Sequence, residues 1–174
     1  MDVSGESNGV ALKEVTYQDG SVVFRIPADW VQEREGDGTD VFYGKGSDAT
    51  LRLSVMHAKA SQPADAAGLL HGMLGAMASA EGTVREFDNN TAVATSIDRR
   101  NENGLEIMVQ EWTVISPIPP QHLRVAVFSY AFRAAEAESA QIKQEIALLD
   151  REIVQARISR ELPPARKPWW KIWR

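Results

Sequence analysis

The sequence predicts an α+β domain in which an antiparallel β-sheet of about six or seven strands is flanked by helices, as an α/β/α sandwich. Short segments such as residues 22–26 and 51–55 carry apolar side chains at every second position, which is the period of a half-buried strand. Two longer segments carry apolar residues at spacings of four and three, which is the period of a helix. The order of strands, helix, strands and helix is typical of the α+β class.

Turns separate the predicted strands. Pro27 ends the first strand because proline has no amide hydrogen to donate to a neighbouring strand. An acidic turn follows over residues 33–40, and a later polar turn is expected over residues 99–104. The predicted strands cover residues 22–26, 41–43, 51–55, 84–87, 91–97, 105–116 and 123–133.

Two helices are predicted. The first starts after Pro63, with Ser61 or Gln62 as its cap, and ends near Gly82. The second covers residues 134–158. Their apolar stripes are Ala66, Leu70, Met73 and Met77 in the first helix, and Ile142, Ile146, Leu149 and Ile153 in the second.

The last two long strands are apolar on both faces near their middles. Residues 107–109 of one strand and residues 125–128 of the other are consecutive apolar residues. Such strands suit the centre of a sheet that is covered on both sides. We therefore expect helices on both faces of the sheet.

Length and composition predict one globular domain. The chain has 174 residues, of which 44% are hydrophobic and 25% charged, and these are ordinary values for a folded protein. We expect a flexible lead-in over residues 1–14, a single α+β domain over residues 15–160, and a basic, tryptophan-rich tail over residues 161–174.

Charge and cysteine content exclude several classes of function. Residues 166–174 carry a net charge of +4, so the other 165 residues carry −9 of the total of −5. Nucleic-acid binding is not expected, because it requires a basic face. The chain has no cysteine, which excludes disulfides and thiol chemistry. Its first residues show neither a basic nor an apolar signal region, so we expect a cytoplasmic protein unless a leader was removed.

No motif predicts catalysis, a cofactor or a metal site. Residues 44–49 match a relaxed dinucleotide fingerprint, but they precede a strand rather than a helix, so a hairpin turn is the better interpretation. His57, His71 and His122 lack the spacing of metal ligands. We therefore expect a protein that is not an enzyme, with no catalytic, cofactor-binding or metal-binding residues.

A row of glycines lines one face of the first predicted helix. Gly68, Gly72 and Gly75 lie at positions i, i+4 and i+7, and each costs about 1 kcal/mol relative to alanine in a helix interior. Close packing of this helix on its own sheet is the first explanation. The alternative is a groove that receives a helix of a partner.

The tail contains three of the five tryptophans of the chain. Tryptophan among basic residues suits an aromatic anchor in a partner's pocket or contact with a lipid surface, although the tail could also fold back onto the acidic body. Trp30 and Trp112 are expected in or near the core. The residues of the tail that we expect to bind a partner are Arg166, Lys167, Trp169, Trp170, Lys171 and Trp173.

Residues 15–158 resemble the PsbP-like and Mog-like superfamily, which includes the bacterial DcrB-type proteins. The resemblance lies in Phe24-x-Ile26-Pro27-x-x-Trp30, the strand over residues 51–55, a helix after a proline, two long strands and a closing amphipathic helix. It implies an antiparallel sheet flanked by helices and a non-catalytic accessory or binding role. One bacterial branch consists of chaperones for the membrane-inserting segments of type VI secretion effectors.

The leading hypothesis is a non-enzymatic adaptor or chaperone-like module that binds another protein, linked to type VI secretion effectors if the resemblance extends that far. The first alternative is a peripheral membrane protein that contacts lipid weakly through the tail. The second is a small-ligand-binding protein or an enzyme with a site assembled around His57 or His122. No residue pattern identifies the partner or the oligomeric state.

Overall fold

Residues 10–36, 39–77, 82–87 and 91–162 are described by a computed structural model of the chain. Within these residues, seven antiparallel strands form a main sheet in the order β3-β4-β5-β9-β8-β7-β6, and three form a small sheet in the order β1-β2-β10. The main sheet contains β3 (Val31–Arg34), β4 (Asp40–Tyr43), β5 (Thr50–Lys59), β6 (Thr83–Phe87), β7 (Thr91–Glu102), β8 (Leu105–Ile118) and β9 (His122–Arg133).

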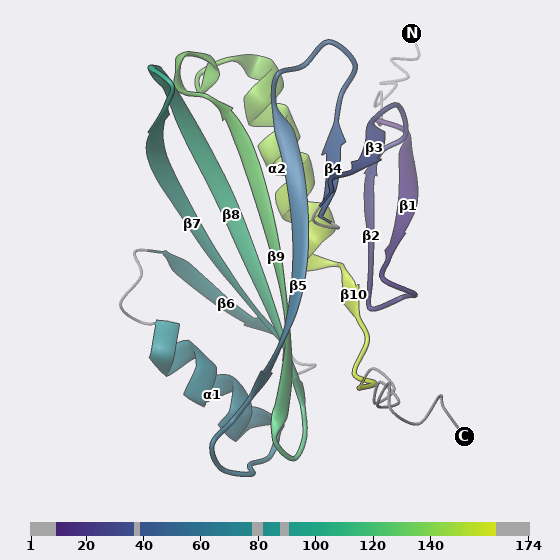
Figure 1. The fold of residues 1–174 in the computed structure, drawn as a ribbon, viewed down its shortest axis with the longest axis vertical. Coiled ribbons are helices and arrows are strands. Elements are labelled where there is room, and N and C mark those ends of the chain that lie inside the picture. Colours follow the sequence, from purple (N-terminus) through teal and green to yellow (C-terminus); the bar gives the residue numbers. More distant parts are fainter. Residues whose placement is uncertain (1–9, 37–38, 78–81, 88–90, 163–174) are drawn as a thin grey trace, which may run out of the picture.

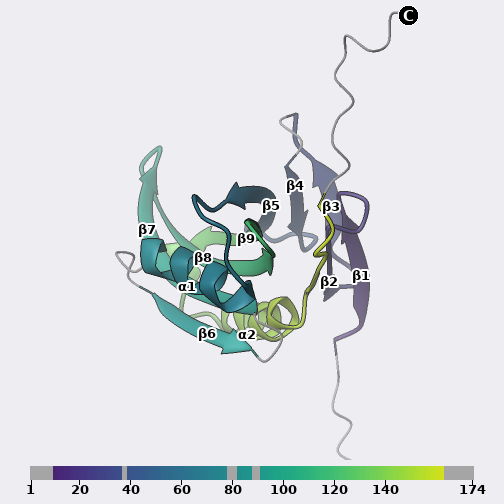
Figure 2. The same ribbon diagram turned by 90° about the horizontal axis from the view of Figure 1, so that it is seen from below.

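The small sheet and two helices complete the described fold. The small sheet contains β1 (Leu12–Tyr17), β2 (Val22–Pro27) and β10 (Arg157–Ile158), and the helices are α1 (Ala66–Met77) and α2 (Ala140–Val154), with a 3₁₀ turn over Ala134–Glu136. Figure 1 shows α2 running behind β5 and β9, and α1 crossing the lower end of the main sheet. Figure 2 shows the small sheet on the side of the molecule away from α1. The predicted α+β class with an antiparallel sheet is confirmed.

One face of the main sheet packs on α2 and the small sheet. Trp112 of β8 and Phe128 of β9 are fully buried there, together with Leu149 of α2 and Phe24 of β2. Phe24 contacts Phe128 edge-on, with ring centroids 5.0 Å apart. This layer explains the aromatic content of the central strands, because large rings bury the most apolar area per residue.

Trp30, the last residue of the Ile-Pro-x-x-Trp element, belongs to the same layer. Its ring stacks on Tyr130 with centroids 6.2 Å apart, and it is 5% exposed. The Tyr130 hydroxyl donates to Glu145 of α2. Burial, and then this hydrogen bond, raise the pKa of Tyr130 above its ordinary value. The predicted core positions of Trp30 and Trp112 are confirmed.

The opposite face of the main sheet is covered by α1 at one end. Leu69 and Leu70 pack against Ile115, Leu123 and Val125 of β8 and β9. The Asp65 side chain accepts a hydrogen bond from the Gly68 amide at 2.8 Å and so caps the helix. The cap is therefore neither Ser61 nor Gln62, because the helix begins at Ala66, later than predicted.

Several predicted elements have different limits. The acidic segment after Trp30 contains β3, which pairs with β4, and β1 begins at Leu12 in a region predicted to be irregular. The polar turn predicted over residues 99–104 is mostly strand, and only Asn103 and Gly104 adopt the positive φ values of a tight turn. The second predicted helix is divided into a 3₁₀ turn, α2 and β10.

Candidate functional site: the open face of the main sheet

The half of the main sheet that α1 leaves uncovered forms a concave surface of about 550 Å³. We call it the open face. Helices were expected on both faces, but the only helix that packs on this side in the described part of the chain is α1, and it packs on the other half. The main lining residues are Thr50, Arg52, Ser54, Arg100, Leu105, Ile107, Val109, Glu111, Val127, Ser129, Ala131 and Arg133.

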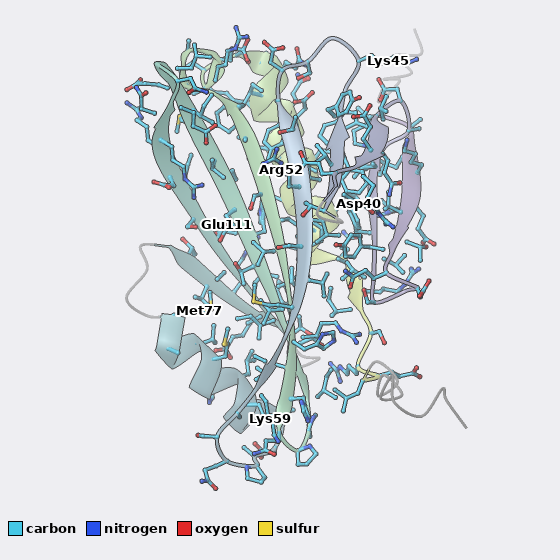
Figure 3. The ribbon with its side chains drawn as sticks, in the orientation of Figure 1. Asp40, Lys45, Arg52, Lys59, Met77 and Glu111 are labelled. Carbon is cyan, nitrogen blue, oxygen red and sulfur yellow. The ribbon has the colours of Figure 1, made fainter. Side chains whose placement is uncertain are left out.

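Strand register determines which side chains meet on the open face. Glu111 of β8 pairs with Ser129 of β9, which pairs with Arg52 of β5. Residues directly opposite in an antiparallel pair project on the same side, so these three side chains form one row across the sheet. Arg52 and Glu111 therefore lie on the strands either side of β9 (Figure 3).

Apolar side chains lie next to this row. In the following row, Val109 of β8 pairs with Ala131 of β9, and Ile107 pairs with Arg133 one row beyond. On the other side of Glu111, Val127 belongs to the row nearer α1. Val109 is buried, whereas Ile107, Val127 and Ala131 are half-buried. The open face therefore has an apolar floor on both sides of Glu111.

Each arginine of the open face is already paired with a carboxylate. Arg52 lies 3.0 Å from Glu35, and Arg133 pairs with Asp48. Arg100 lies 2.8 Å from Asp98, and the hydrogen bond between them raises the pKa of Arg100 and lowers that of Asp98. These exposed ion pairs contribute little to the free energy of folding. Because of them, every arginine that lines the open face already has a carboxylate partner.

Glu111 differs from these paired groups. It is half-buried and accepts long hydrogen bonds from Ser129 at 3.3 Å and from Thr113 at 3.4 Å. Among the described side chains, no lysine or arginine lies within ion-pair distance of it. Its neighbours are the hydroxyl groups of Ser129 and Thr113 and the apolar Val109, and a half-buried carboxylate of this kind is a natural point of contact for a cationic group.

The glycine row does not face the main sheet. Gly68, Gly72 and Gly75 are exposed, and a β-carbon added at Gly72 or Gly75 would meet no atom within 4 Å. The explanation by close packing of α1 on its own sheet is therefore wrong, because Leu69 and Leu70 form that contact instead. Gly68 and Gly72 line a second, mainly apolar groove of about 390 Å³ beside the end of β5. Its use by a partner helix remains a prediction.

We expect Gly72→Ala and Gly75→Ala each to raise the free energy of unfolding by about 0.5–1 kcal/mol, because alanine removes the helix penalty of glycine without a clash. Gly68→Ala is the matched control, since its new β-carbon would lie 3.0 Å from the Ala64 side chain. Urea denaturation measures all three. A loss of stability at Gly72 would contradict the open surroundings of that residue.

Arg124 is a buried arginine on the α2 side of β9, and its partners are half-buried or exposed. It is 3% exposed and donates to the carbonyl oxygens of Ser159 and Glu161 at 2.5 and 2.6 Å, and to Nε2 of His57 at 3.0 Å. This cluster, which we call the arginine clamp, holds the segment after β10 against the end of the main sheet. The sequence does not reveal this role, because Arg124 looks like any single basic residue within a predicted strand.

His57 belongs to the arginine clamp, and His122 lies on β9 two residues before Arg124. Burial first, then the charges of Arg124 and His122, lower the pKa of His57 below its ordinary value. No group of three or more histidines and carboxylates in the described chain is arranged to hold a metal ion. The geometry assigns His57 an acceptor role toward Arg124, and His71 lies elsewhere, 3.8 Å from Glu86.

Because the pKa of His57 is lowered in the folded state, folding favours its neutral form. Its contribution to stability is present above the ordinary histidine pKa of about 6.5 and is lost as the pH falls through the folded value. We expect the free energy of unfolding to decrease between about pH 7 and pH 5 and the decrease to be smaller in His57→Gln. His71→Gln, measured in the same denaturation series, should show the same decrease as the unaltered protein. An equal decrease of the free energy of unfolding in both variants would contradict the prediction.

The predicted tail residues Arg166, Lys167, Trp169, Trp170, Lys171 and Trp173 lie outside the described residues. The structure describes the chain up to Leu162, which is 47% exposed. In the described part of the chain, none of the helices combines the length and the apolar character needed to cross a membrane.

Comparison with known proteins supports the fold. No family model and no curated protein matches the chain. A crystal structure from Bacteroides thetaiotaomicron aligns with 90% of this chain at a TM-score of 0.57 and 17% identity, and this chain covers about half (51%) of that one. LpqN, a Mycobacterium tuberculosis protein involved in cell envelope biogenesis, aligns with 86% of this chain and 91% of its own at a TM-score of 0.55 and 14% identity. At these identities the likeness concerns the fold alone.

The solution structure of cyanobacterial PsbP from Synechocystis also aligns, over 91% of this chain and 99% of its own, at a TM-score of 0.36 and 12% identity. A PsbP is thus among the solved structures that align with this chain. We draw no conclusion about the architecture from an alignment with so low a TM-score. The narrower assignment to DcrB-type proteins remains a prediction from the sequence.

Proposed function

We propose that this protein is a non-enzymatic accessory module that binds another protein through the open face. The observation that supports this most directly is the exposure of central strands that would ordinarily be covered. Strands β8, β9 and β5 present half-buried apolar side chains there, together with Glu111, which has no ion pair among the described residues. A concave surface that combines half-buried apolar side chains with polar and charged groups is typical of protein-binding sites.

LpqN, which shares the fold, is a protein involved in cell envelope biogenesis, and an accessory role for this chain is consistent with that likeness. The sequence resemblance to DcrB-type proteins adds a narrower proposal, in which the client is a segment of a type VI secretion effector. A concave sheet surface suits such a client, because its apolar side chains can cover an apolar segment that water would otherwise contact.

Site-specific photo-crosslinking in the native cell tests the proposal. A photoreactive residue replaces Ser129 on the open face in one variant and the exposed Glu14 of β1 in a matched control. We expect one partner to crosslink from position 129 and not from position 14. Equal labelling from both positions, or none from position 129, would contradict the proposal. The same two variants are also made in a protein that ends at Leu162. A crosslink from position 129 that persists in this shorter protein is due to the open face and not to the tail.

Peripheral membrane contact is the second candidate, and the basic tryptophan-rich sequence of residues 166–174 favours it. The experiment is sedimentation with anionic vesicles at low salt. Cosedimentation that is lost in the variant ending at Leu162 would support lipid contact by the tail. A protein that stays in the supernatant would exclude this candidate.

A further inference from the structure

One side chain of the main sheet holds the segment after β10, residues 159–162. Arg124 donates from Nη1 and Nη2 to the carbonyl oxygens of Ser159 and Glu161. Its Nε donates to Nε2 of His57 at 3.0 Å. The guanidinium group is planar, so its N–H groups keep fixed directions relative to one another. A movement of Arg124 that breaks the bond to His57 therefore also displaces the two donors that hold the segment.

The buried charge of Arg124 is not balanced by an ion pair. The side chain is 3% exposed, and no aspartate or glutamate of the described chain lies within ion-pair distance of it. Burial lowers the pKa of Arg124, and the charge of Glu161 opposes this only in part. A buried cation without an ion pair depends on the hydrogen-bond acceptors around it. Arg124 therefore depends on His57 as an acceptor.

Protonation reverses the role of His57 in the arginine clamp. The Nε2 atom accepts a hydrogen bond only while it carries no proton, and both ring nitrogens of a protonated histidine are donors. Protonated His57 therefore presents a donor and a positive charge to Arg124, which is itself a donor and positively charged. Because the His57 side chain is exposed, a proton reaches it from solvent without any opening of the core.

The other charged groups near His57 come from three elements. Burial first, then the charges of Arg124 and His122 of β9, lower the pKa of His57. Lys59 lies two residues further along β5, on the same side of the strand. From the segment after β10, Glu161 acts on Arg124 with the opposite sign. Arg124 and Lys59 are cationic, so a further positive charge on His57 favours separation of these groups.

We propose that the arginine clamp is a proton-sensitive latch, which opens when His57 takes up a proton and releases residues 159–162 from the end of the main sheet. The rest of the fold stays in place, because β10 still pairs with β2 and the apolar layer under α2 contains neither Arg124 nor His57. Opening returns His57 to an ordinary environment, so the open form binds the proton more tightly than the closed form does. Acidification therefore shifts the equilibrium toward the open form. The latch involves neither the open face nor a partner, so it is independent of the proposed function.

A spin label just after the clamp measures this opening in the full-length protein. The chain has no cysteine, so Leu162→Cys supplies a single attachment point for a nitroxide at a residue that is 47% exposed. Electron paramagnetic resonance then gives the fraction of mobile label at each pH. We expect this fraction to rise about threefold or more between about pH 7.5 and about pH 5.5, because the ordinary histidine pKa of about 6.5 lies within this range. The rise should reverse when the pH is restored.

Three variants of the labelled protein identify the group that titrates. His57→Gln keeps an acceptor for Arg124 but does not titrate, so it should remove the pH dependence. His122→Gln is the matched control, because His122 lies on the same side of β9 two residues before Arg124, and it should keep the pH dependence. Arg124→Met should give the signal of the open form at every pH.

Four results would overturn the proposal. A mobile fraction that does not change with pH would show that the His57 ring turns away while Arg124 keeps both carbonyl oxygens. Equal pH dependence in His57→Gln and in the otherwise unaltered labelled protein would assign the change to another group. Equal mobility in Arg124→Met and the unaltered protein at neutral pH would show that Arg124 does not hold the segment. A label at the exposed Glu14 of β1 that becomes mobile over the same pH range would show general unfolding in acid.

Discussion

Replacing Trp112 by alanine should lower the free energy of unfolding by about 3–5 kcal/mol, because it leaves a large cavity between β8 and α2. Trp112 is 1% exposed, and its indole Nε1 donates to Asp150 of α2 at 2.9 Å. The same carboxylate accepts from Arg85 of β6, and hydrogen bonds from Arg85 and then Trp112 lower the pKa of Asp150 against the opposing effect of burial. The indole of Trp112 therefore connects the apolar layer to the ion pair between Arg85 and Asp150.

A second variant separates the effect of the cavity from that of the lost hydrogen bond, and a third serves as a control at an exposed site. Trp112→Phe keeps most of the ring volume and removes the donor, so we expect a smaller loss of about 1–2 kcal/mol. Met56→Ala, at a side chain 51% exposed, should change the free energy of unfolding by less than about 0.5 kcal/mol. Urea denaturation followed by circular dichroism measures all three. A loss below about 1 kcal/mol for Trp112→Ala would contradict the described core.

Replacing Arg124 by methionine should release the segment after β10. The change keeps the length of the side chain but removes three hydrogen bonds, and we expect a loss of about 2 kcal/mol in the free energy of unfolding. Because Arg160 lies between the two clamped carbonyls, trypsin cleavage after Arg160 should accelerate roughly tenfold under native conditions. Cleavage is followed by mass spectrometry of the intact protein.

Arg157→Met is the matched control for the arginine clamp. Arg157 makes an exposed ion pair with Glu14 at 3.0 Å, and exposed pairs contribute less than about 1 kcal/mol. It should therefore leave cleavage after Arg160 nearly unchanged. If both variants release the segment equally, β10 and not Arg124 holds the end of the described chain.

The sequence predicts those parts of the fold that local patterns determine. Strands β2 and β5 follow from period-two alternation, β4, β8 and β9 follow from runs of apolar residues between turns, and α2 follows from its apolar stripe. Trp30 and Trp112 were placed in the core by size alone, and both lie there. These predictions are correct because each depends on residues that are close together along the chain.

Features that depend on distant residues could not be predicted. Strand β3 is hidden in an acidic segment, and its polar side chains are satisfied by Asp40 of β4, which accepts from Arg34 at 2.6 Å and Gln32 at 3.0 Å. Asp40 is 1% exposed, and the hydrogen bond from Arg34 is the main cause of its lowered pKa. Nothing in the sequence shows that these residues meet.

The open face was missed for a similar reason. An amphipathic helix pattern shows which side of α1 is buried, but not how much of the sheet a helix of 12 residues covers. The sequence likewise predicted the glycine row on one face of α1 but could not show whether that face meets the sheet or solvent. The partners of Arg124 lie 35, 37 and 67 residues away along the chain, beyond the reach of any local pattern.

The small sheet joins the two ends of the described chain, and this affects the order in which the protein folds during its synthesis. Strand β10 pairs with β2, and Arg157 bonds to Glu14 across 143 residues. Contacts of such long sequence separation form late, because loop closure is costly before they are made. The consecutive strands β7, β8 and β9 can pair while the chain is still on the ribosome. The layer behind them is complete only after translation has passed α2, because Ile142, Leu149 and Ile153 of that helix belong to it.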